Sequence, residues 1–398
     1  MTEASAFTQL LVIVAPDIGA GGSVSDIALR HAHLLSSQFR VHIVTRSVPA
    51  HLPAHIGRTL VQPVNWNWLR RFCHVPNELA FALSARRAIL DLHSSQGSVD
   101  AIWCHGHSIA ALAGAPLKVR VGAAMVATVH GDIFDRPRGT YSRELTALYE
   151  WSARRTHAVA DAIHAISPKI AEAAIRHGAP AEHVHTISHG IDPEEVGLLD
   201  THPRAVQDFM EGGRLRLLYV GALLPVKGVD VLVRAAAAVT SHPVELVLAG
   251  DGPEKKRLEM LAHSLGVNTT FLGAVPRNEL GKHYRRADIV CVPSLSEALS
   301  LATLEAMVCG TPVVASNTGG IPSLITHGRC GLLAEAGDAF ALGECLSGAA
   351  SSPEYLATLG AQGWARARRD FSWPVIGKQL EALALTAIES ARMRKGPG

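Results

Sequence analysis

The chain has 398 residues, of which 48% are hydrophobic, and a formal net charge of +2 at pH 7. This length is too great for one ordinary hydrophobic core and predicts two domains. The nearly balanced charge carries no signature of a nucleic-acid or other polyanionic partner. The 6 cysteines occur singly, without a Cys-x-x-Cys pair, which is typical of reduced thiols in a cytoplasmic protein.

The sequence shows no targeting or membrane-spanning pattern. Glu3 is followed closely by the apolar segment 10–15, which does not resemble a signal peptide. No apolar segment approaches the roughly 20 residues that a transmembrane helix requires. Residues 66–72 mix Trp and Phe with Arg, which favours a loop that packs its aromatic side chains inward, with a peripheral membrane contact as the alternative.

Short apolar segments alternate with helical patterns along the chain, which is typical of β-α-β units. Expected strands of a first parallel sheet are residues 10–15, 41–45, 101–104, 124–129, 162–166 and 183–187. Expected strands of a second sheet are residues 215–220, 244–249, 270–272, 289–292 and 313–315. The two series predict an α/β protein with two doubly wound, Rossmann-like domains and a cleft between them.

The domain boundaries follow from these series. An N-terminal domain is expected over residues 1–195 and a C-terminal domain over residues 205–374, joined by the charged, Pro-marked segment 191–203. The helical pattern over residues 375–398 comes too late for either sheet, and we expect it to return to the first domain.

Two glutamates mark the most informative segment. Glu297 follows the expected strand 289–292, and Glu305 lies nearly two turns into a helix expected over residues 299–308. The first N–H groups of that helix, at Ser300 and Leu301, favour a bound anion such as a diphosphate. Glu297 could then hold hydroxyls on one side of the anion and Glu305 hydroxyls on the other, as a sugar and a ribose would require. The simpler interpretation is two helix-dipole partners on a solvated surface.

Other strands of the predicted sheets are followed by polar or glycine-rich loops. His130 directly follows the segment 124–129 and is either a structural histidine or a side chain at the site. Lys227, in the loop after residues 215–220, offers a positive charge to a phosphate, or is a solvated loop lysine. No Asp-x-Asp motif is present to hold a metal ion beside a diphosphate.

Two of these loops contain glycines. Gly21 and Gly22 follow the first strand, but position 24 is Val where a dinucleotide fingerprint has its third Gly. They serve either a plain tight turn or a loop whose backbone approaches a phosphate or an acceptor. Gly252 lies in a turn after residues 244–249, where it either serves the turn alone or approaches a nucleoside.

Together these segments resemble the retaining glycosyltransferases of family 4, which have the GT-B fold. The resemblance extends over nearly the whole chain. The motifs that carry it are Gly21-Gly22, residues 221–228, Gly250-Asp-Gly-Pro253, the Glu-x7-Glu pair, residues 310–315 and Gly319-Gly-Ile-Pro322.

The resemblance implies a role for each matching residue. Glu297 would hold hydroxyls of the transferred sugar, and Glu305 would hold the ribose. Lys227, together with the N–H groups of Ser300 and Leu301, would neutralise the diphosphate. His130 would border the reacting centre. Backbone around Val275 would contact the base.

Three positions depart from the family pattern. Ala222 stands where the family usually has Arg, so one phosphate-binding cation is absent. Ser300 replaces a usual Gly, which narrows the approach of the backbone to the phosphate. His189 replaces a usual Asn.

The sequence thus predicts a cytoplasmic retaining hexosyltransferase. Its partners would be a nucleoside diphosphate sugar as donor and an acceptor hydroxyl, without a metal or another cofactor. Two alternatives share the fold: a nucleotide-sugar epimerase, which needs no acceptor, and a degenerate relative that binds nucleotide without turnover. The sugar, the base and the acceptor are not encoded in a readable pattern.

Overall fold

The computed structural model describes residues 9–15, 23–47, 52–61, 75–106, 111, 114–131 and 143–395. The chain divides into two compact units, the first made of residues 1–188 and 376–398 and the second of residues 189–375. The chain therefore passes between the units twice, after Ser188 and after Val375. Residues 191–203, the predicted linker, are grouped with the second unit.

The first unit contains a seven-stranded parallel sheet in the order β3-β2-β1-β4-β5-β6-β7. Its strands are β1 (Leu10–Val14), β2 (Arg40–Thr45), β3 (Gly57–Leu60), β4 (Val99–His105), β5 (Ala124–Val129), β6 (Ala162–Ala165) and β7 (Val184–Thr186). Its helices are α1 (Ser23–Leu35), α2 (Val75–Ser95), α3 (Gly114–Val121), α4 (Arg143–Val159) and α5 (Pro168–Arg176).

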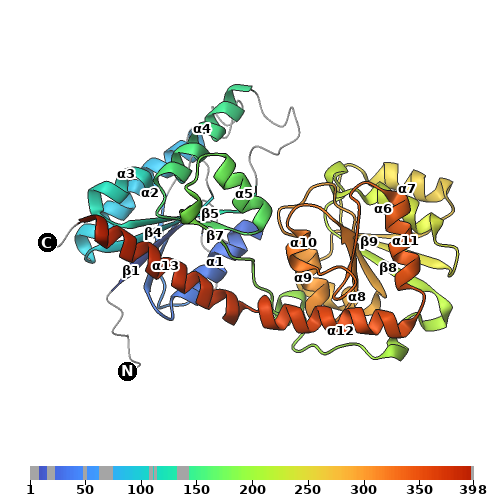
Figure 1. Ribbon diagram of the computed structural model, residues 1–398. Helices are drawn as coiled ribbons and strands as arrows, with labels where there is room; N and C mark the ends of the chain where they lie inside the picture. The colour runs from blue at the N-terminus through green and yellow to red at the C-terminus, as the bar shows by residue number, and fades with distance from the viewer. Residues whose placement is uncertain are drawn as a thin grey trace. The chain divides into compact units, whose positions relative to one another are not determined.

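The second unit contains a six-stranded parallel sheet in the order β10-β9-β8-β11-β12-β13. Its strands are β8 (Leu215–Val220), β9 (Val244–Ala249), β10 (Asn268–Gly273), β11 (Ile289–Val292), β12 (Val313–Ser316) and β13 (Leu332–Ala334). Its helices are α6 (Val229–Ala238), α7 (Lys255–Ser264), α8 (Leu280–Arg286), α9 (Leu301–Val308), α10 (Ile321–Leu324), α11 (Ala339–Ala349) and α12 (Pro353–Asp370). Helices α6, α7 and α11 cover one face of this sheet, and α8, α9 and α10 cover the other (Figure 1).

Every predicted strand is present, with small shifts at its ends. The strands of both sheet centres are buried on both faces, which is why they appear in the sequence as unbroken apolar segments. The prediction omitted β3 and β13. Both lie at a sheet edge. β3 alternates between half-buried and exposed residues, and β13 is apolar but only 3 residues long.

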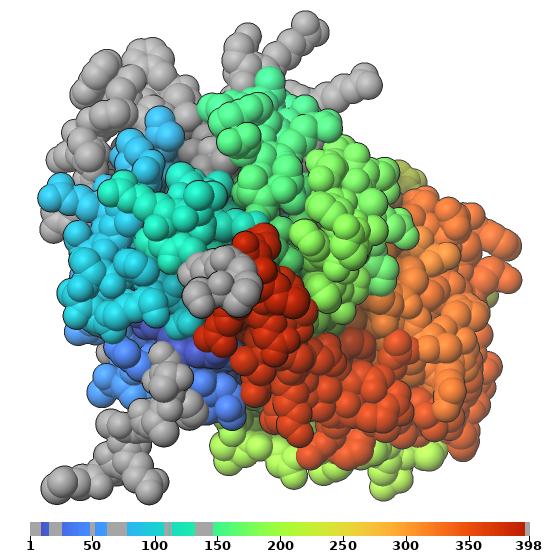
Figure 2. Space-filling view, turned by 60° about the vertical axis from the view of Figure 1, so that its left-hand side comes forward, coloured from blue at the N-terminus to red at the C-terminus, as the bar shows by residue number. Residues whose placement is uncertain are grey.

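Helix α13 (Trp373–Lys395) begins in the second unit and continues in the first from Ile376 onward. Gly377 of this helix lies against Leu34 of α1. Near its end, Arg392 pairs with Asp100 at 3.3 Å, and Arg394 pairs with the buried Asp161. The end of the helix, in red, lies on the first unit in Figure 2. Residues 376–398, the expected returning helix, are grouped with the first unit.

A hydrophobic core fills the second unit between its sheet and the helices α6, α7, α11 and α12. Among the described residues, no helix is long and apolar enough to cross a membrane.

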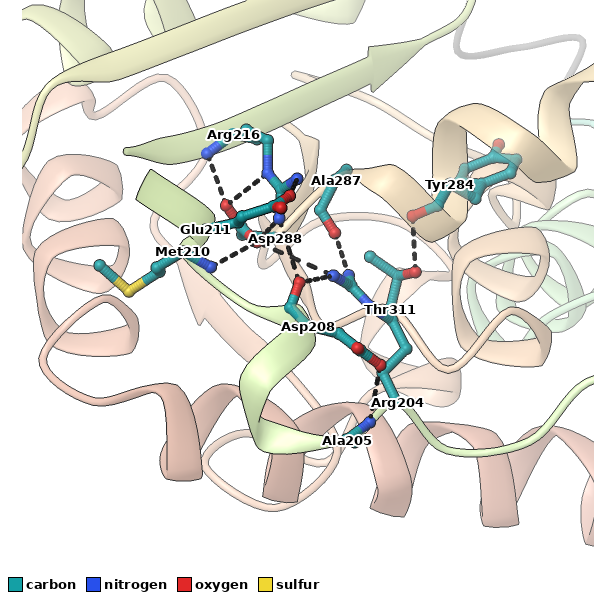
Figure 3. A network of polar contacts seen from close by, with 10 residues as sticks. All are labelled: Arg204, Ala205, Asp208, Met210, Glu211, Arg216, Tyr284, Ala287, Asp288 and Thr311. Carbon is teal, nitrogen blue, oxygen red and sulfur yellow. Dashed lines mark hydrogen bonds and ion pairs between the residues drawn. The ribbon is translucent and has the colours of Figure 1, made fainter. Parts of the chain in front are cut away.

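A buried carboxylate joins the segments at the amino end of the second sheet. Asp288, fully buried before β11, accepts hydrogen bonds from the backbone N–H groups of Met210 at 2.9 Å and Arg216 at 2.8 Å. The guanidinium of Arg216 reaches both of its oxygens, at 2.9 and 3.2 Å, and that of Arg204 lies 3.8 Å away (Figure 3). Asp288 therefore satisfies several polar groups that would otherwise be buried without a partner.

A series of linked hydrogen bonds crosses the core of the first unit. Trp103 donates its indole N–H to the hydroxyl of Thr128 at 2.8 Å, and that hydroxyl lies 3.1 Å from His164 Nδ1. His164 Nε2 lies 2.8 Å from the carbonyl of Ile187, which only accepts, so His164 carries its proton on Nε2. Burial lowers the pKa of His164 from 6.5 to about 4.

Stability should therefore fall in acid. As the pH drops below 6.5, the unfolded chain protonates His164 while the folded protein does not until about pH 4. The contribution of His164 to the free energy of unfolding is complete above pH 6.5 and is lost as the pH falls toward 4, by roughly 3 kcal/mol in total. Chemical denaturation at pH 7, 5.5 and 4.5 measures it. His164→Gln should show a shallower pH dependence and the exposed His33→Gln an unchanged one. Equal slopes in all three proteins would assign the acid sensitivity to another group.

Candidate functional site

The order of the second sheet predicts a ligand site between β8 and β11. From these adjacent strands the chain proceeds in opposite directions across the sheet, and doubly wound sheets bind ligands beyond the carboxyl ends of the strands at such a point. The loop after β8 contains Lys227 and the loop after β11 contains Glu297, so both predicted residues lie there.

The two loops pack tightly together. Lys227 ends the short 3₁₀ turn Pro225–Lys227, and Gly228 follows with φ of +60°. A side chain at Gly228 would put its Cβ 2.2 Å from the carbonyl oxygen of Pro293, and Leu295 N–H donates to Val226 at 2.8 Å. Only glycine fits both the backbone conformation and the space at position 228.

This packing brings Lys227 and Glu297 into direct contact. Lys227 Nζ lies 2.7 Å from Glu297 Oε2, and the hydroxyl of Ser294 lies 3.1 Å from the same oxygen. The side chains keep 27% and 16% of their surface exposed, so the pair is accessible to a ligand. A diphosphate could attract the ammonium of Lys227, and sugar hydroxyls could occupy the oxygens of Glu297.

Helix α9 begins beside this pair with an unusual backbone. Ser300, the residue before Leu301, has φ of +91° and is buried. Its hydroxyl accepts a hydrogen bond from the Thr303 N–H at 3.3 Å. The helix was predicted to begin at Leu299 but begins at Leu301, because Ser300 is not in a helical conformation. The Thr303 N–H is thus capped, and the N–H groups before it lack acceptors within the helix and remain suited to an anion.

Replacing Ser300 should reveal the backbone strain that its positive φ imposes. Ser300→Gly removes the cost of a positive φ, about 1 kcal/mol, and loses only a few tenths from the cap. Ser300→Ala keeps the strain and loses the cap. We therefore expect Ser300→Gly to unfold at the same or a higher temperature than wild type and Ser300→Ala at a lower one. The reverse order in thermal melts would contradict this assignment of strain.

Glu305 lies deeper than Glu297, with a residue exposure of 4%. Its Oε1 accepts from Arg277 Nε at 2.7 Å and its Oε2 accepts from the Tyr284 hydroxyl at 2.7 Å. Burial, followed by the charge of Glu305, raises the pKa of Tyr284 well above its ordinary value, so the phenol stays a donor. The sequence prediction missed both partners, because no spacing relates them to Glu305.

Three more predicted residues of the second unit, Ala222, Gly252 and Val275, lie in loops that follow β8, β9 and β10. Gly252 approaches the loop after β8 so closely that a Cβ would lie 2.4 Å from the Leu223 carbonyl oxygen. Val275 lies between β10 and the turn Arg277–Glu279, two residues before Arg277. Ala222 is exposed, and its carbonyl accepts a hydrogen bond from the Tyr219 hydroxyl at 2.8 Å. His189 is buried.

In the first unit, His130 follows β5 at the carboxyl edge of the sheet. Its Nε2 lies 3.2 Å from His105 Nδ1, and the two rings stack with centroids 5.4 Å apart. Two of the predicted features, the Gly21-Gly22 pair and the segment 66–72, lie outside the described residues. Within the described residues, no group of three His, Cys, Asp or Glu side chains is arranged to hold a metal ion.

Family models match both halves of the chain. The model for Glycosyltransferase Family 4 matches residues 21–195, and the model for Glycosyl transferases group 1 matches residues 207–364. The solved structure of Anabaena HepE in complex with UDP and glucose superposes with a TM-score of 0.71, covering 95% of this chain and 100% of that one, at 21% identity. The two sheets and their helices therefore form the GT-B fold of glycosyltransferases.

Sequence relatives narrow this class to a family. The chain is 30% identical over 404 residues to a D-inositol 3-phosphate glycosyltransferase of Xylanimonas cellulosilytica, covering 90% of each. It is 33% identical over 227 residues to the enzyme of the same name from Kribbella flavida, covering 54% of this chain and 53% of that one. In the Kribbella match and in several others to enzymes of the same name, the chain spans about half the length of the curated relative. The chain belongs to the family 4 glycosyltransferases.

Proposed function

We propose that the protein transfers a hexosyl unit from a nucleoside diphosphate sugar to an acceptor hydroxyl, with retention of configuration. The observation that carries this proposal is the Lys227–Glu297 pair at the start of α9, between β8 and β11, with Glu305 on the same helix. HepE, which shares the fold, binds UDP and glucose, and this supports a nucleotide-sugar donor.

In this proposal the donor rearranges the ion pair. Lys227 turns from Glu297 to the diphosphate, where the first N–H groups of α9 also stabilise negative charge. The freed oxygens of Glu297 then accept hydrogen bonds from the sugar hydroxyls, while Glu305 accepts those of the ribose. The positioning of the donor and the stabilisation of its charge, more than a strong protein base, would lower the activation barrier of transfer.

Retention follows if the acceptor attacks the face that the diphosphate leaves. The bond between the anomeric carbon and the phosphate oxygen breaks, and its electron pair stays with the diphosphate. The acceptor oxygen bonds to the anomeric carbon, and its proton passes to the departing phosphate oxygen.

Lys227 also supports chemistry without a metal ion, because it supplies a positive charge where a cation would neutralise the diphosphate. The family's usual second cation is absent at Ala222, so Lys227 would carry a larger share of this task. The buried free thiols Cys104, Cys291, Cys309 and Cys330 support the proposed cytoplasmic location.

A donor screen tests the proposal. UDP-, GDP- and ADP-hexoses are incubated with excess EDTA, with and without a hydroxyl acceptor. The names of the relatives make inositol phosphate the first acceptor to try. We expect transfer that needs the acceptor, is unchanged by EDTA, and falls at least about tenfold in Lys227→Ala. Strict dependence on Mg²⁺ or Mn²⁺ would contradict the role of Lys227.

The same screen separates the alternatives. An epimerase would alter the donor without an acceptor, and a degenerate relative would bind nucleotide without turnover. The family comparisons favour neither of them.

A further inference from the structure

Arg277 pairs with two carboxylates that lie far apart in the sequence. Its Nε lies 2.7 Å from Glu305 Oε1, and its Nη1 lies 2.9 Å from Glu195 Oε2. Its side chain retains 34% of its exposure, whereas those of Glu305 and Glu195 retain 6% and 12%. The guanidinium therefore joins a carboxylate of the candidate donor site to one outside that site.

Glu195 is held by the segments through which the chain enters and leaves the second unit. Its other oxygen, Oε1, accepts from the backbone N–H of Asp192 at 3.1 Å and from the indole N–H of Trp373. These segments lie side by side, because Ile191 N–H donates to the carbonyl of Phe371 at 2.8 Å. Glu195 thus has a fixed position, with Oε2 directed at Arg277.

We infer that Arg277 is a positioning residue for the donor, and that Glu195 keeps it in the productive orientation. The inference rests on the proposed function, in which Glu305 binds ribose. Each carboxylate oxygen can accept about two hydrogen bonds. Arg277 and Tyr284 use one on each oxygen of Glu305, which leaves one on each for the two ribose hydroxyls.

Glu195 matters because a guanidinium can bind a carboxylate through two parallel N–H groups. Without its pair to Glu195, Arg277 could turn this fork onto both oxygens of Glu305 and take the positions that the ribose needs. A residue that does not contact the nucleotide would then control its affinity.

Glu195→Gln isolates this effect. A glutamine can keep its oxygen at the Oε1 position, where it accepts from Asp192 and Trp373, while its amide NH₂ faces the N–H groups of Arg277. We expect calorimetry to show about tenfold weaker binding of UDP, GDP or ADP, whichever the wild type binds. In steady-state assays the donor KM should rise by a similar factor with kcat nearly unchanged, because the ribose contact is the same in the ground and transition states.

A double-mutant cycle with Arg277→Met separates positioning from simple damage to the fold. If Glu195 acts through Arg277, Glu195→Gln should have no further effect on affinity in the Arg277→Met background. Lys282→Met serves as the matched control, since Lys282 forms an exposed pair with Glu279 at 3.0 Å on the neighbouring helix.

Additive losses in the cycle, or wild-type affinity in Glu195→Gln, would overturn the inference. A wild-type protein that binds none of the three nucleotides would instead overturn the proposed function, and the inference with it. Thermal melts of each variant identify any that fail to fold. Arg277→Lys, which keeps the charge, should then show a nucleotide affinity between those of the wild type and Arg277→Met.

Discussion

Glu297→Gln is expected to lower transfer by at least about 100-fold while leaving the affinity for bare nucleoside diphosphate unchanged or higher. The amide has one oxygen that accepts hydrogen bonds from the sugar hydroxyls, whereas the carboxylate has two, so the orientation of the sugar is lost. The affinity is preserved because the ammonium of Lys227 lies 2.7 Å from Glu297, which competes with a diphosphate for it. Removing its charge releases the ammonium for the diphosphate.

Two measurements on the same variant test this expectation. Initial rates with saturating donor report the loss of turnover, and calorimetry with bare nucleoside diphosphate reports affinity. Glu259→Gln, an exposed glutamate on α7, is the control and should match the wild type in both. Near wild-type turnover in Glu297→Gln would remove Glu297 from the site. Loss of nucleotide affinity would mean that Glu297 contacts the nucleotide and not the sugar.

The largest loss of stability is expected from Asp288→Ala, which should lower the free energy of unfolding by about 3–5 kcal/mol. Asp288 is fully buried and accepts from two backbone N–H groups and the guanidinium of Arg216. Its loss leaves the two backbone N–H groups without that acceptor and removes the carboxylate whose two oxygens both accept from the largely buried guanidinium of Arg216 (Figure 3). Burial lowers the pKa of the neighbouring Arg204 to about 10, so in the wild-type protein this guanidinium is also charged at pH 7 beside Asp288.

Equilibrium denaturation in urea measures this loss of stability. The control lies in the same network, because Arg216 also pairs at 3.5 Å with Glu211, whose side chain is 82% exposed. Glu211→Ala should cost less than about 1 kcal/mol, since exposed ion pairs contribute little. Equal costs for the two substitutions would show that burial does not determine the value of these contacts.

Much of the fold follows from local patterns. The central strands could be located because both of their faces are buried, so their sequences are nearly continuous runs of apolar residues. The edge strand β3 lacks that requirement, since its residues are half-buried or exposed, and β13 is apolar but only 3 residues long. The start of α9 was misplaced because Ser300 adopts a positive φ, which propensity alone does not indicate for a serine.

The sequence by itself determined the two doubly wound sheets, the family resemblance, and the placing of Lys227 and Glu297 in loops that follow strands. Only the tertiary structure decided which side chains meet. The contact between Lys227 and Glu297 spans 70 positions and exists because the sheet order makes β8 and β11 neighbours. Arg277, Tyr284 and Glu195 lie around Glu305 for the same kind of reason. Periodicity reports which face of an element is buried, whereas the partner of a charged side chain depends on how distant elements pack, and no local spacing encodes that.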